Sequence, residues 1–252
     1  MSPFKVPHPD ESLHIFGVNT KRVLGDEKIS VLVWNVYKGK RGKTFFQDFI
    51  KLTETSDFIL LQEAMIDETM PELWKTHRDL HHWKMAASFE YLHDRSRTGV
   101  ITGSLVQSDK YRLIRSVERE FFFWTPKVSL CSYYHIEGSA EKLLVINTHV
   151  VNFVTTAGFR VFIMELVKVI QEHQGPILFG GDFNTWNPWR WEALLEVLAE
   201  FNLEHLVFQR DPRLLKLDHV FLRGFAVHSA EIKQEIQSSD HYPLEILLRL
   251  KG

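Results

Sequence analysis

The sequence is poor in cysteine, with Cys131 as its only thiol, so no disulfide bond can form within the chain. This usage suits a reducing compartment. Cys131 lies in an apolar segment, 127–136, that we expect to be a strand. A nucleophilic role is the alternative, but no thiol-enzyme motif surrounds the residue, so we interpret it as a small core side chain.

The sequence also lacks an apolar run long enough to span a bilayer. Residues 1–10 hold three prolines and no apolar stretch typical of a signal peptide. We therefore expect a monomeric cytoplasmic protein without a transmembrane segment, although a chain trimmed of a leader would look the same. The 30 Lys and Arg nearly balance the 32 Asp and Glu, giving a net charge of −2. Binding to nucleic acid would therefore require a local basic patch.

Several common catalytic motifs are missing, including GxSxG, GxGxxG and HExxH. The segment 39–44 ends like a phosphate-binding P-loop, but Tyr37 stands where that motif needs its first glycine. We interpret the segment as a basic loop that either meets a substrate phosphate or is a solvated turn. His77, His81 and His82 have helix-like spacing, yet without HExxH a metal role is the weaker interpretation.

Against these absences, one segment is highly informative, running from Gly175 to Trp186. A short apolar run predicts a buried strand, and two glycines then allow a tight turn or a close approach to a ligand. Asp182 and Asn184 follow, two residues apart, and so point to the same side of an extended backbone. A carboxylate and a carboxamide side by side could hold a metal-bound phosphate and a water molecule.

The same design of an apolar run followed by polar residues recurs along the chain. It is found at Asn35, Gln62–Glu63, 147–149 and Asp218–His219, and the polar segment 238–241 precedes a last apolar run. The carboxyl ends of strands line the ligand crevice in layered α/β folds. If these ends converge, they form a cluster of oxygen donors and imidazoles.

Some members of this cluster have roles suggested by their chemistry. A carboxylate after a buried strand, as at Glu63, is costly unless it is paired or metal-bound, and hard divalent cations prefer such oxygen ligands. His149 and Asn152 lie three residues apart and could share a site. If Asp218 contacts His241, the imidazole is oriented and more readily protonated, and can stabilise a phosphoryl oxygen.

The coarse organisation is an alternation of strands and helices after an irregular N-terminal arm. We expect the arm over residues 1–28 and a single catalytic domain over 29–252. Helices are expected over 44–55, 67–78, 159–172 and 189–201, the last preceded by Pro188. Two groups of strands with helices between them predict two sheets packed face to face with helices outside.

The ordered motifs resemble the endonuclease/exonuclease/phosphatase (DNase I-like) superfamily, and most closely its short bacterial YafD-like branch. They are Trp34-Asn35-Val36, Leu61-Gln62-Glu63, Thr98-Gly99-Val100, Asn147-Thr148-His149, Gly181-Asp182-Phe183-Asn184, Leu217-Asp218-His219-Val220-Phe221 and Ser239-Asp240-His241-Tyr242-Pro243-Leu244. The resemblance covers about residues 29–250. It implies an α/β four-layer α/β/β/α sandwich of two mixed β-sheets, Mg²⁺ or Mn²⁺ as cofactor, and hydrolysis of a phosphate ester.

The resemblance also implies roles, residue by residue. Glu63 would be the main metal ligand, with Asn35 and Asp240 close by. Asp182 would orient or deprotonate the attacking water, while Asn184 and Asn152 would hold the phosphate. His241, backed by Asp218, would bind the phosphoryl oxygen, and His149 stands where some relatives carry tyrosine.

The resemblance leaves the substrate open, because the fold does not fix it. Basic side chains beside the expected strand ends favour a polyanion such as nucleic acid, and Lys40, Arg41, Arg97 and Trp186 are candidate substrate contacts. A phospholipid, as in sphingomyelinases, or an inositol phosphate is the alternative. The lack of an exposed hydrophobic hairpin in the sequence pattern favours nucleic acid. A phosphate-binding protein without catalysis is the alternative of another class.

Overall fold

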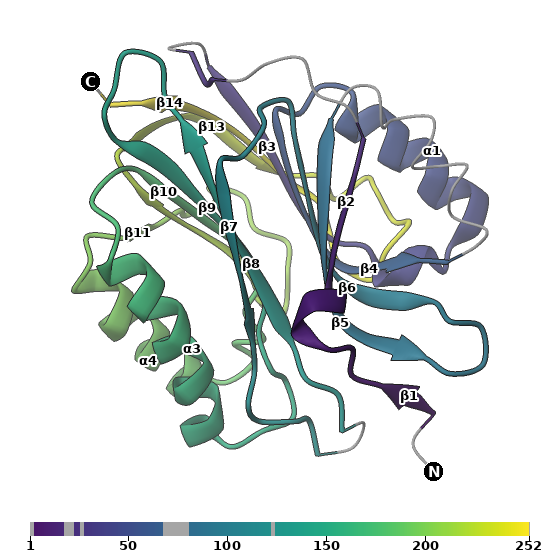
Figure 1. The fold of residues 1–252 in the computed structure, drawn as a ribbon. Helices are drawn as coiled ribbons and strands as arrows, with labels where there is room; N and C mark the ends of the chain where they lie inside the picture. Colours follow the sequence, from purple (N-terminus) through teal and green to yellow (C-terminus); the bar gives the residue numbers. More distant parts are fainter. Residues whose placement is uncertain (1–2, 18–22, 26–27, 68–80, 122–123, 252) are drawn as a thin grey trace.

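A computed structural model describes residues 3–17, 23–25, 28–67, 81–121 and 124–251 of the 252-residue chain. Two sheets pack face to face, with α1 outside one of them and α3 and α4 outside the other (Figure 1). This is the expected four-layer α/β/β/α arrangement. The expected helix over 67–78 lies outside the described residues, apart from Asp67.

The first sheet has eight strands in the order β1-β5-β6-β4-β3-β14-β13, with β2 also pairing with β5. Its strands are β1 (Phe4–Lys5), β2 (Leu13–Phe16), β3 (Ile29–Asn35), β4 (Phe58–Ile66), β5 (His82–Tyr91), β6 (Arg97–Ser104), β13 (Phe225–Ile232) and β14 (Leu244–Leu250). The central pair, β3 and β4, is parallel, with Asn35 opposite Gln62. Both central strands therefore end at the same edge.

The second sheet has six strands in the order β11-β12-β10-β9-β8-β7. They are β7 (Lys110–Arg115), β8 (Val128–His135), β9 (Lys142–His149), β10 (Ile177–Asp182), β11 (Glu204–His205) and β12 (Asp218–Arg223). Here β9 and β10 are parallel, and β12 runs antiparallel beside β10. The ends of β9 and β10 thus meet the beginning of β12.

Three helices and two short 3₁₀ turns complete the described fold: α1 (Gly42–Thr53), α3 (Thr156–Gln171), α4 (Pro188–Ala199), η1 (Pro9–Glu11) and η2 (Tyr37–Gly39). Thr155 and Asn187 cap α3 and α4, each accepting a backbone N–H three residues on. These boundaries agree with the sequence expectation to within a few residues.

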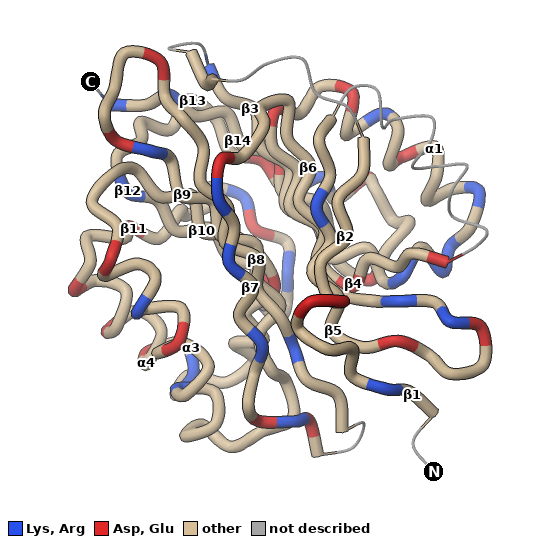
Figure 2. Tube along the Cα trace, in the orientation of Figure 1, with Lys and Arg blue, Asp and Glu red and all other residues tan. Residues whose placement is uncertain are grey.

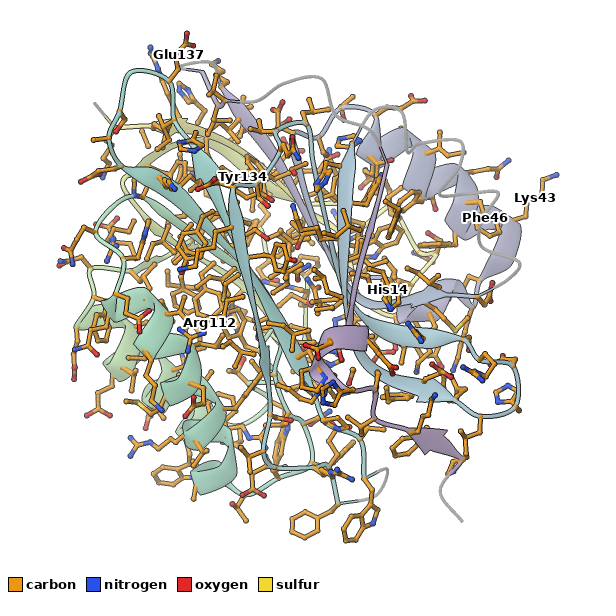
Figure 3. All side chains as sticks on the ribbon, viewed as in Figure 1. His14, Lys43, Phe46, Arg112, Tyr134 and Glu137 are labelled. Atoms are coloured by element: carbon orange, nitrogen blue, oxygen red, sulfur yellow. The ribbon has the colours of Figure 1, made fainter. Side chains whose placement is uncertain are left out.

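Strand periodicity explains the layers, because alternate residues of one strand face opposite neighbours. In β9, Leu143 and Val145 pack between the two sheets, whereas Leu144 and Ile146 pack against the helices. All four are fully buried, which is the pattern of a strand covered on both faces. Figure 3 shows the continuous side-chain packing and places Tyr134 between the sheets, while Lys43 projects from α1 into solvent.

The N-terminal arm is not irregular throughout, contrary to the sequence expectation. β1 and β2 both add to β5, with Phe4 opposite Tyr91 and Leu13 opposite Ala86. These strands are only two and four residues long, too short for an alternating pattern to stand out. Their partner residues in β5 come 67 to 87 positions later in the chain, so tertiary contacts rather than local propensity create them.

Candidate active site

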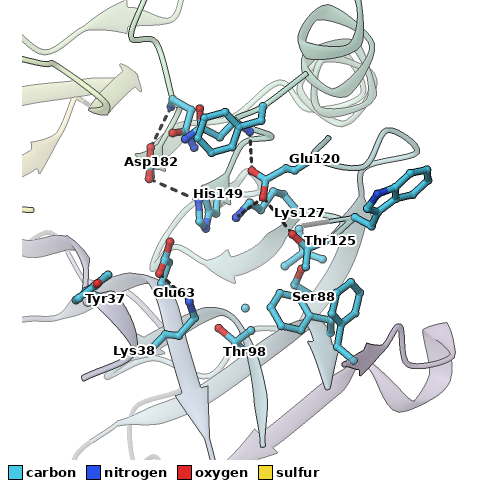
Figure 4. Close-up of a pocket in the computed structure, with 18 of the residues that line it drawn as sticks. Tyr37, Lys38, Glu63, Ser88, Thr98, Glu120, Thr125, Lys127, His149 and Asp182 are labelled. Carbon is cyan, nitrogen blue, oxygen red and sulfur yellow. Dashed lines mark hydrogen bonds and ion pairs between the residues drawn. The ribbon is translucent and has the colours of Figure 1, made fainter. Parts of the chain in front are cut away.

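A cavity of about 660 Å³ opens where strands of both sheets end (Figure 4). The first sheet and its turns contribute Tyr37, Lys38, Glu63 and Thr98, and the second contributes His149 and Asp182 from the opposite side. The site is therefore formed between the sheets, at the edge predicted from the strand ends.

Asp182 is the central residue of the second sheet's contribution. It ends β10 and lies in register with His149 of β9 on one side and Asp218 of β12 on the other. Three polar side chains thus occupy one row across the sheet. Gly181 permits this row: its φ is 145°, and a Cβ there would lie 2.0 Å from the Thr148 carbonyl oxygen.

Asn35 joins the two sheets at this point. Its amide Nδ2 donates to Asp182 Oδ2 at 3.0 Å, and its backbone oxygen accepts a hydrogen bond from Ser239 Oγ at 2.6 Å. The Trp34 indole donates to the His241 carbonyl at 3.0 Å. β3 therefore positions both Asp182 and the loop that carries His241.

His241 and Asp218 form the pair that the sequence analysis required. His241 Nδ1 lies 2.8 Å from Asp218 Oδ2. Burial disfavours the charged imidazole, but the charge and hydrogen bond of Asp218 outweigh it and raise the pKa of His241 to about 10. His241 is therefore a cation at neutral pH, and it lines the cavity.

Asp182 has the opposite tendency. Burial raises its pKa to about 7, with the charge of Asp218 adding to the effect and the charge of His241 opposing it. A carboxyl group that titrates near neutrality can accept a proton from water and release it again. The site thus holds a carboxyl group and an imidazole whose pKa values are both raised.

His149 is buried, and burial lowers its pKa well below its usual value, helped by the charges of Lys127, His241 and Lys38. Its Nε2 lies 3.6 Å from Asp182 Oδ2. Because the imidazole is neutral, we interpret this contact as a polar neighbour rather than an ion pair. A neutral ring can still donate one N–H toward the cavity.

Glu63 enters the cavity through an irregularity in β4. The register between β4 and β6 shifts between Leu61 and Ala64, and Glu63 has a φ of 50°. Such a bulge redirects a side chain out of the regular alternation. The Glu63 carboxylate lies 3.4 Å from Lys38 Nζ.

A buried amide pair braces this bulge from the second sheet. Gln62 Nε2 donates to Asn147 Oδ1 at 2.8 Å, and Asn147 Nδ2 donates to the Leu61 carbonyl at 3.2 Å and to Ile101 O at 2.9 Å. Both amides are fully buried. The network fixes the backbone on either side of the turn into Glu63.

Asn184 and Asn152 lie on neighbouring loops that line the cavity. The Asn184 backbone N–H donates to Asp182 Oδ1 at 3.0 Å, and its side-chain amide donates to Val150 O at 2.8 Å. The Asn152 side-chain oxygen accepts from the Trp186 indole at 2.9 Å. The structure therefore brings both amides to the site.

Backbone strain is concentrated around the cavity. Seven described non-glycine residues have positive φ, and five of them line the cavity: Tyr37, Lys38, Glu63, Trp124 and Asn184. Each such conformation costs on the order of 1–3 kcal/mol and persists only where the surroundings impose it. This clustering supports a functional role for the cavity.

Within the described residues, Asp182, Asp218 and His241 form a group whose candidate ligand atoms lie within 4.8 Å of one another. A protonated imidazole has no free lone pair, so we do not assign His241 as a metal ligand. The predicted metal ligands fit a divalent cation better by chemistry. Glu63 and Asp240 bring carboxylates to the cavity, and Asn35 lies directly behind Asp182.

The residues predicted to contact the substrate do not line the cavity. Lys40 lies over the Tyr37 ring at 4.4 Å, Arg41 donates to Gln237 O at 2.5 Å, and Arg97 pairs with the buried Glu90 at 2.8 Å. None of the three lines the cavity. Arg97 in particular is a structural ion-pair partner, because Glu90 also pairs with Lys5 and Arg95. The Trp186 indole donates a hydrogen bond to Asn152, which does line the cavity.

Sequence reasoning missed the wall formed by the β7–β8 connection. Glu120 accepts the backbone N–H of Asn152 at 2.9 Å and lies 3.3 Å from Lys127 Nζ, and both line the cavity with Trp124. Phe121 and Trp124 are each 68% exposed. The expectation that no hydrophobic hairpin is exposed is thus wrong, and the aromatic run 121–124 was the signal available in the sequence.

Cys131, His81 and His82, which the sequence offered as candidates, do not line the cavity. Cys131 is fully buried in the core, as expected, and burial raises its pKa to about 12. His81 Nε2 lies 2.7 Å from the Ser56 carbonyl, and His82 Nδ1 lies 3.0 Å from Lys84 Nζ. These two histidines face polar partners of the fold, and His77 lies outside the described residues.

Comparison with known proteins identifies the family and agrees with the fold. The model of the Endonuclease/Exonuclease/phosphatase family matches residues 32–241. A UPF0294 protein of Vibrio campbellii is 35% identical over 233 residues, which cover 89% of this chain and 79% of that protein.

Solved structures show the same fold at much lower sequence identity. An endonuclease/exonuclease/phosphatase from Bacteroides vulgatus is 15% identical, with a TM-score of 0.65, covering 89% of this chain and 100% of that one. The human nocturnin catalytic domain, solved with a bound sulfate anion, is 16% identical with a TM-score of 0.64, covering 96% and 99%.

Proposed function

Because this chain belongs to the endonuclease/exonuclease/phosphatase family, whose members hydrolyse phosphoester bonds, we propose that it is a divalent-metal-dependent phosphodiesterase. One observation carries the proposal. Asp182, which ends β10, is joined to Asn35 of the opposite sheet and flanked in register by His149 and Asp218. In this proposal Asp182 is the base, the amides are donors to the phosphate, and the His241–Asp218 pair lies at the same cavity.

The residues divide the chemistry between them. Asp182 orients a water molecule and accepts its proton as the water oxygen bonds to phosphorus. The bond from phosphorus to one ester oxygen breaks in the same displacement, and the leaving alkoxide takes a proton from solvent. Asn152 and Asn184 hold the phosphate, and the His241 cation stabilises the charge that grows on its oxygens. Asp218 fixes the orientation of His241 through Nδ1, which leaves Nε2 for the substrate.

Glu63, with Asp240 and Asn35 nearby, would hold the Mg²⁺ or Mn²⁺ ion. When bound, the cation neutralises charge on a phosphoryl oxygen and acts as a Lewis acid. Lys38, paired with Glu63, occupies the same side of the cavity and compensates the carboxylate. The strained backbone at Glu63 and Lys38 is consistent with a site held ready for a ligand.

The substrate class is the finer question. The sequence favours nucleic acid, but the basic residues beside the cavity are already paired, Lys38 with Glu63 and Lys127 with Glu120. A polyanion gains affinity mainly from free cations. Trp124, which lines the cavity, and Phe121 of the same connection are exposed aromatic residues that suit the interface of a lipid surface, so a phospholipid is the second candidate. We find no such structural observation for an inositol phosphate.

A substrate panel with Mg²⁺ or Mn²⁺ tests the proposal. It should include single- and double-stranded DNA, RNA, sphingomyelin in vesicles and inositol phosphates, with Asp182→Asn as the inactive control. We expect metal-dependent release of a phosphomonoester product from one diester class. No turnover of any diester, together with tight binding of a phosphate ligand, would instead indicate the non-catalytic binding protein.

A further inference from the structure

Arg190, in the first turn of α4, is fully buried and binds backbone carbonyls instead of a carboxylate. Its Nη1 donates to Val151 O and to Asn184 O, each at 3.1 Å, and its Nη2 donates to Val154 O at 2.7 Å and to Asn152 O. One side chain therefore ties the loop after β9 to the loop after β10. These are the loops that carry Asn152 and Asn184.

The two amides are also fixed by their own contacts. An indole N–H can only donate, so the Trp186 hydrogen bond identifies the Asn152 side-chain atom that receives it as the oxygen. The Asn152 NH₂ group is thereby left to face other partners, and Asn152 lines the cavity. Glu120 holds the Asn152 backbone N–H, so this residue is restrained at its backbone N–H, backbone carbonyl and side-chain oxygen.

The Arg190 guanidinium is enclosed by aromatic rings, lying 5.0 Å from the ring centroids of Phe159 and Trp186. Within the part of the chain that the structure describes, no carboxylate lies within 4.0 Å of its nitrogens, and Nε has no hydrogen-bond partner. Burial lowers the pKa of Arg190 to about 10 against the charge of Glu120, which acts on it from beyond ion-pair distance, so Arg190 keeps its charge at neutral pH. A fixed cation without a paired anion therefore lies behind the two amides.

We propose that Arg190 is the positioning residue of a phosphate subsite formed by Asn152 and Asn184. It sets the spacing of the two amides and adds a fixed positive charge behind them, which favours an oxyanion in front. The inference rests on the proposed function, because it assigns how that site binds the phosphate group of its substrate. Trp186 has a supporting role as the residue that orients the Asn152 amide.

Arg223 is a matched control for Arg190, because it lies at the other end of the six-stranded sheet from Asp182. Its guanidinium also clamps backbone carbonyls, those of His173, Gly175 and Phe201. Arg223 lies opposite Ile177, at the other end of β10 from Asp182. Arg190→Met and Arg223→Met should therefore both reduce stability, whereas only the first should weaken phosphate binding.

The experiment measures the dissociation constant of inorganic phosphate by calorimetry, and KM and kcat on whichever diester the wild-type protein hydrolyses. We expect Arg190→Met to raise the phosphate dissociation constant and KM roughly tenfold or more, as loss of a residue supporting ligating groups commonly does. Arg190→Lys, which keeps the charge but cannot bridge four carbonyls, should be intermediate. Equal phosphate affinity in Arg190→Met and Arg223→Met would overturn the inference.

A second pair of variants covers the case in which Arg190→Met does not fold. Trp186→Phe removes the indole donor to Asn152, while Trp189→Phe changes a neighbouring tryptophan that is 71% exposed. We expect weaker phosphate binding only in Trp186→Phe, and no difference between the pair would count against the subsite. If the wild-type protein hydrolyses a diester but does not bind phosphate, this inference alone is wrong. If it neither hydrolyses a diester nor binds phosphate, the proposed function is wrong as well.

Discussion

The two sheets supply the candidate site in different ways. The six-stranded sheet places His149, Asp182 and Asp218 in one row by regular strand pairing. The eight-stranded sheet places Glu63 and Lys38 through a bulge and left-handed backbone. Regular register gives rigid spacing between reacting groups, whereas an irregular backbone re-aims side chains that alternation would otherwise direct elsewhere. We infer that the row around Asp182, which His241 joins through its contact with Asp218, carries proton transfer and charge stabilisation. The side that holds Glu63 and Lys38 carries metal binding.

The charge distribution supports the same division. Figure 2 shows acidic and basic residues interspersed along both sheets rather than gathered in one field. Local pairs therefore determine the electrostatics: Asp218 of the Asp182 row pairs with His241 from the loop before β14, and Glu63 in the bulge of β4 pairs with Lys38. The following changes test whether the two halves separate functionally.

The largest effect is expected for His241→Ala. Loss of the cation that faces the phosphate should lower kcat by on the order of 10³-fold, with little change in the metal concentration needed for half-maximal activity. Steady-state kinetics over a metal titration measures both. His228→Ala, an exposed histidine of β13, is the control. Near-normal turnover in His241→Ala would contradict the charge-stabilising role assigned to His241.

Glu63→Gln should change mainly the metal concentration needed for half-maximal activity. We expect roughly 10- to 100-fold more Mg²⁺ to be needed for half-maximal activity, because a charged oxygen ligand is replaced by a neutral one. The rate at saturating metal should fall less. Glu54→Gln, an exposed residue that follows α1, should behave as wild type. An unchanged metal titration in Glu63→Gln would contradict the division.

The pH dependence of activity tests the roles of Asp182 and His241. Asp182 acts as a base only when deprotonated, so activity should rise about tenfold per pH unit below its pKa of about 7. His241 stabilises charge only when protonated, so activity should fall as pH rises through about 10. A bound cation lowers the pKa of a nearby carboxyl, so more metal should move the lower limb to lower pH. A kcat profile that is flat from pH 5 to 8 would argue against Asp182 as the base.

The pair of buried amides that connects the sheets should give the smallest catalytic effect. Asn147→Ala removes one of the two acceptors of Gln62 Nε2 and the amide that donates to the Leu61 and Ile101 carbonyls, and should lower the free energy of unfolding by about 1–3 kcal/mol. If the network braces the bulge, the metal requirement should also rise by a few fold, while kcat at saturating metal stays close to wild type. Chemical denaturation and metal titration measure the two quantities. Ser104→Ala is the control for stability loss alone, because it removes a buried hydroxyl that donates to Val106 O at 2.7 Å and lies opposite Phe58, at the other end of β4 from Glu63.

The part of the site built by regular strands was largely predictable from the sequence. Apolar runs that end in Asn35, Asp182 and His149 predict that these residues meet, because parallel strands end together. The structure confirms the four-layer fold and brings Asp218 to His241 across 23 residues of chain. In these elements local pattern and global fold agree.

The remainder depends on contacts that a local pattern does not encode. β1 and β2 become strands only by pairing with β5. Arg97 looked like a free cation, but it pairs with the buried Glu90, which lies opposite it across the β5–β6 pairing. Glu120 and Lys127 lie outside any recognised motif and reach the cavity through a loop. Such residues are placed by tertiary structure, so sequence spacing gives little information about them.

The position of β1 has a practical consequence for handling the protein. Pro3 and Phe4 form part of the cavity wall, so a peptide fused ahead of them would emerge beside the opening and could obstruct it. β14 instead leads away from His241, and its six steps from Leu244 to Leu250 carry the chain about 20 Å from the site. Purification handles and surface-immobilisation linkers are therefore better attached after β14.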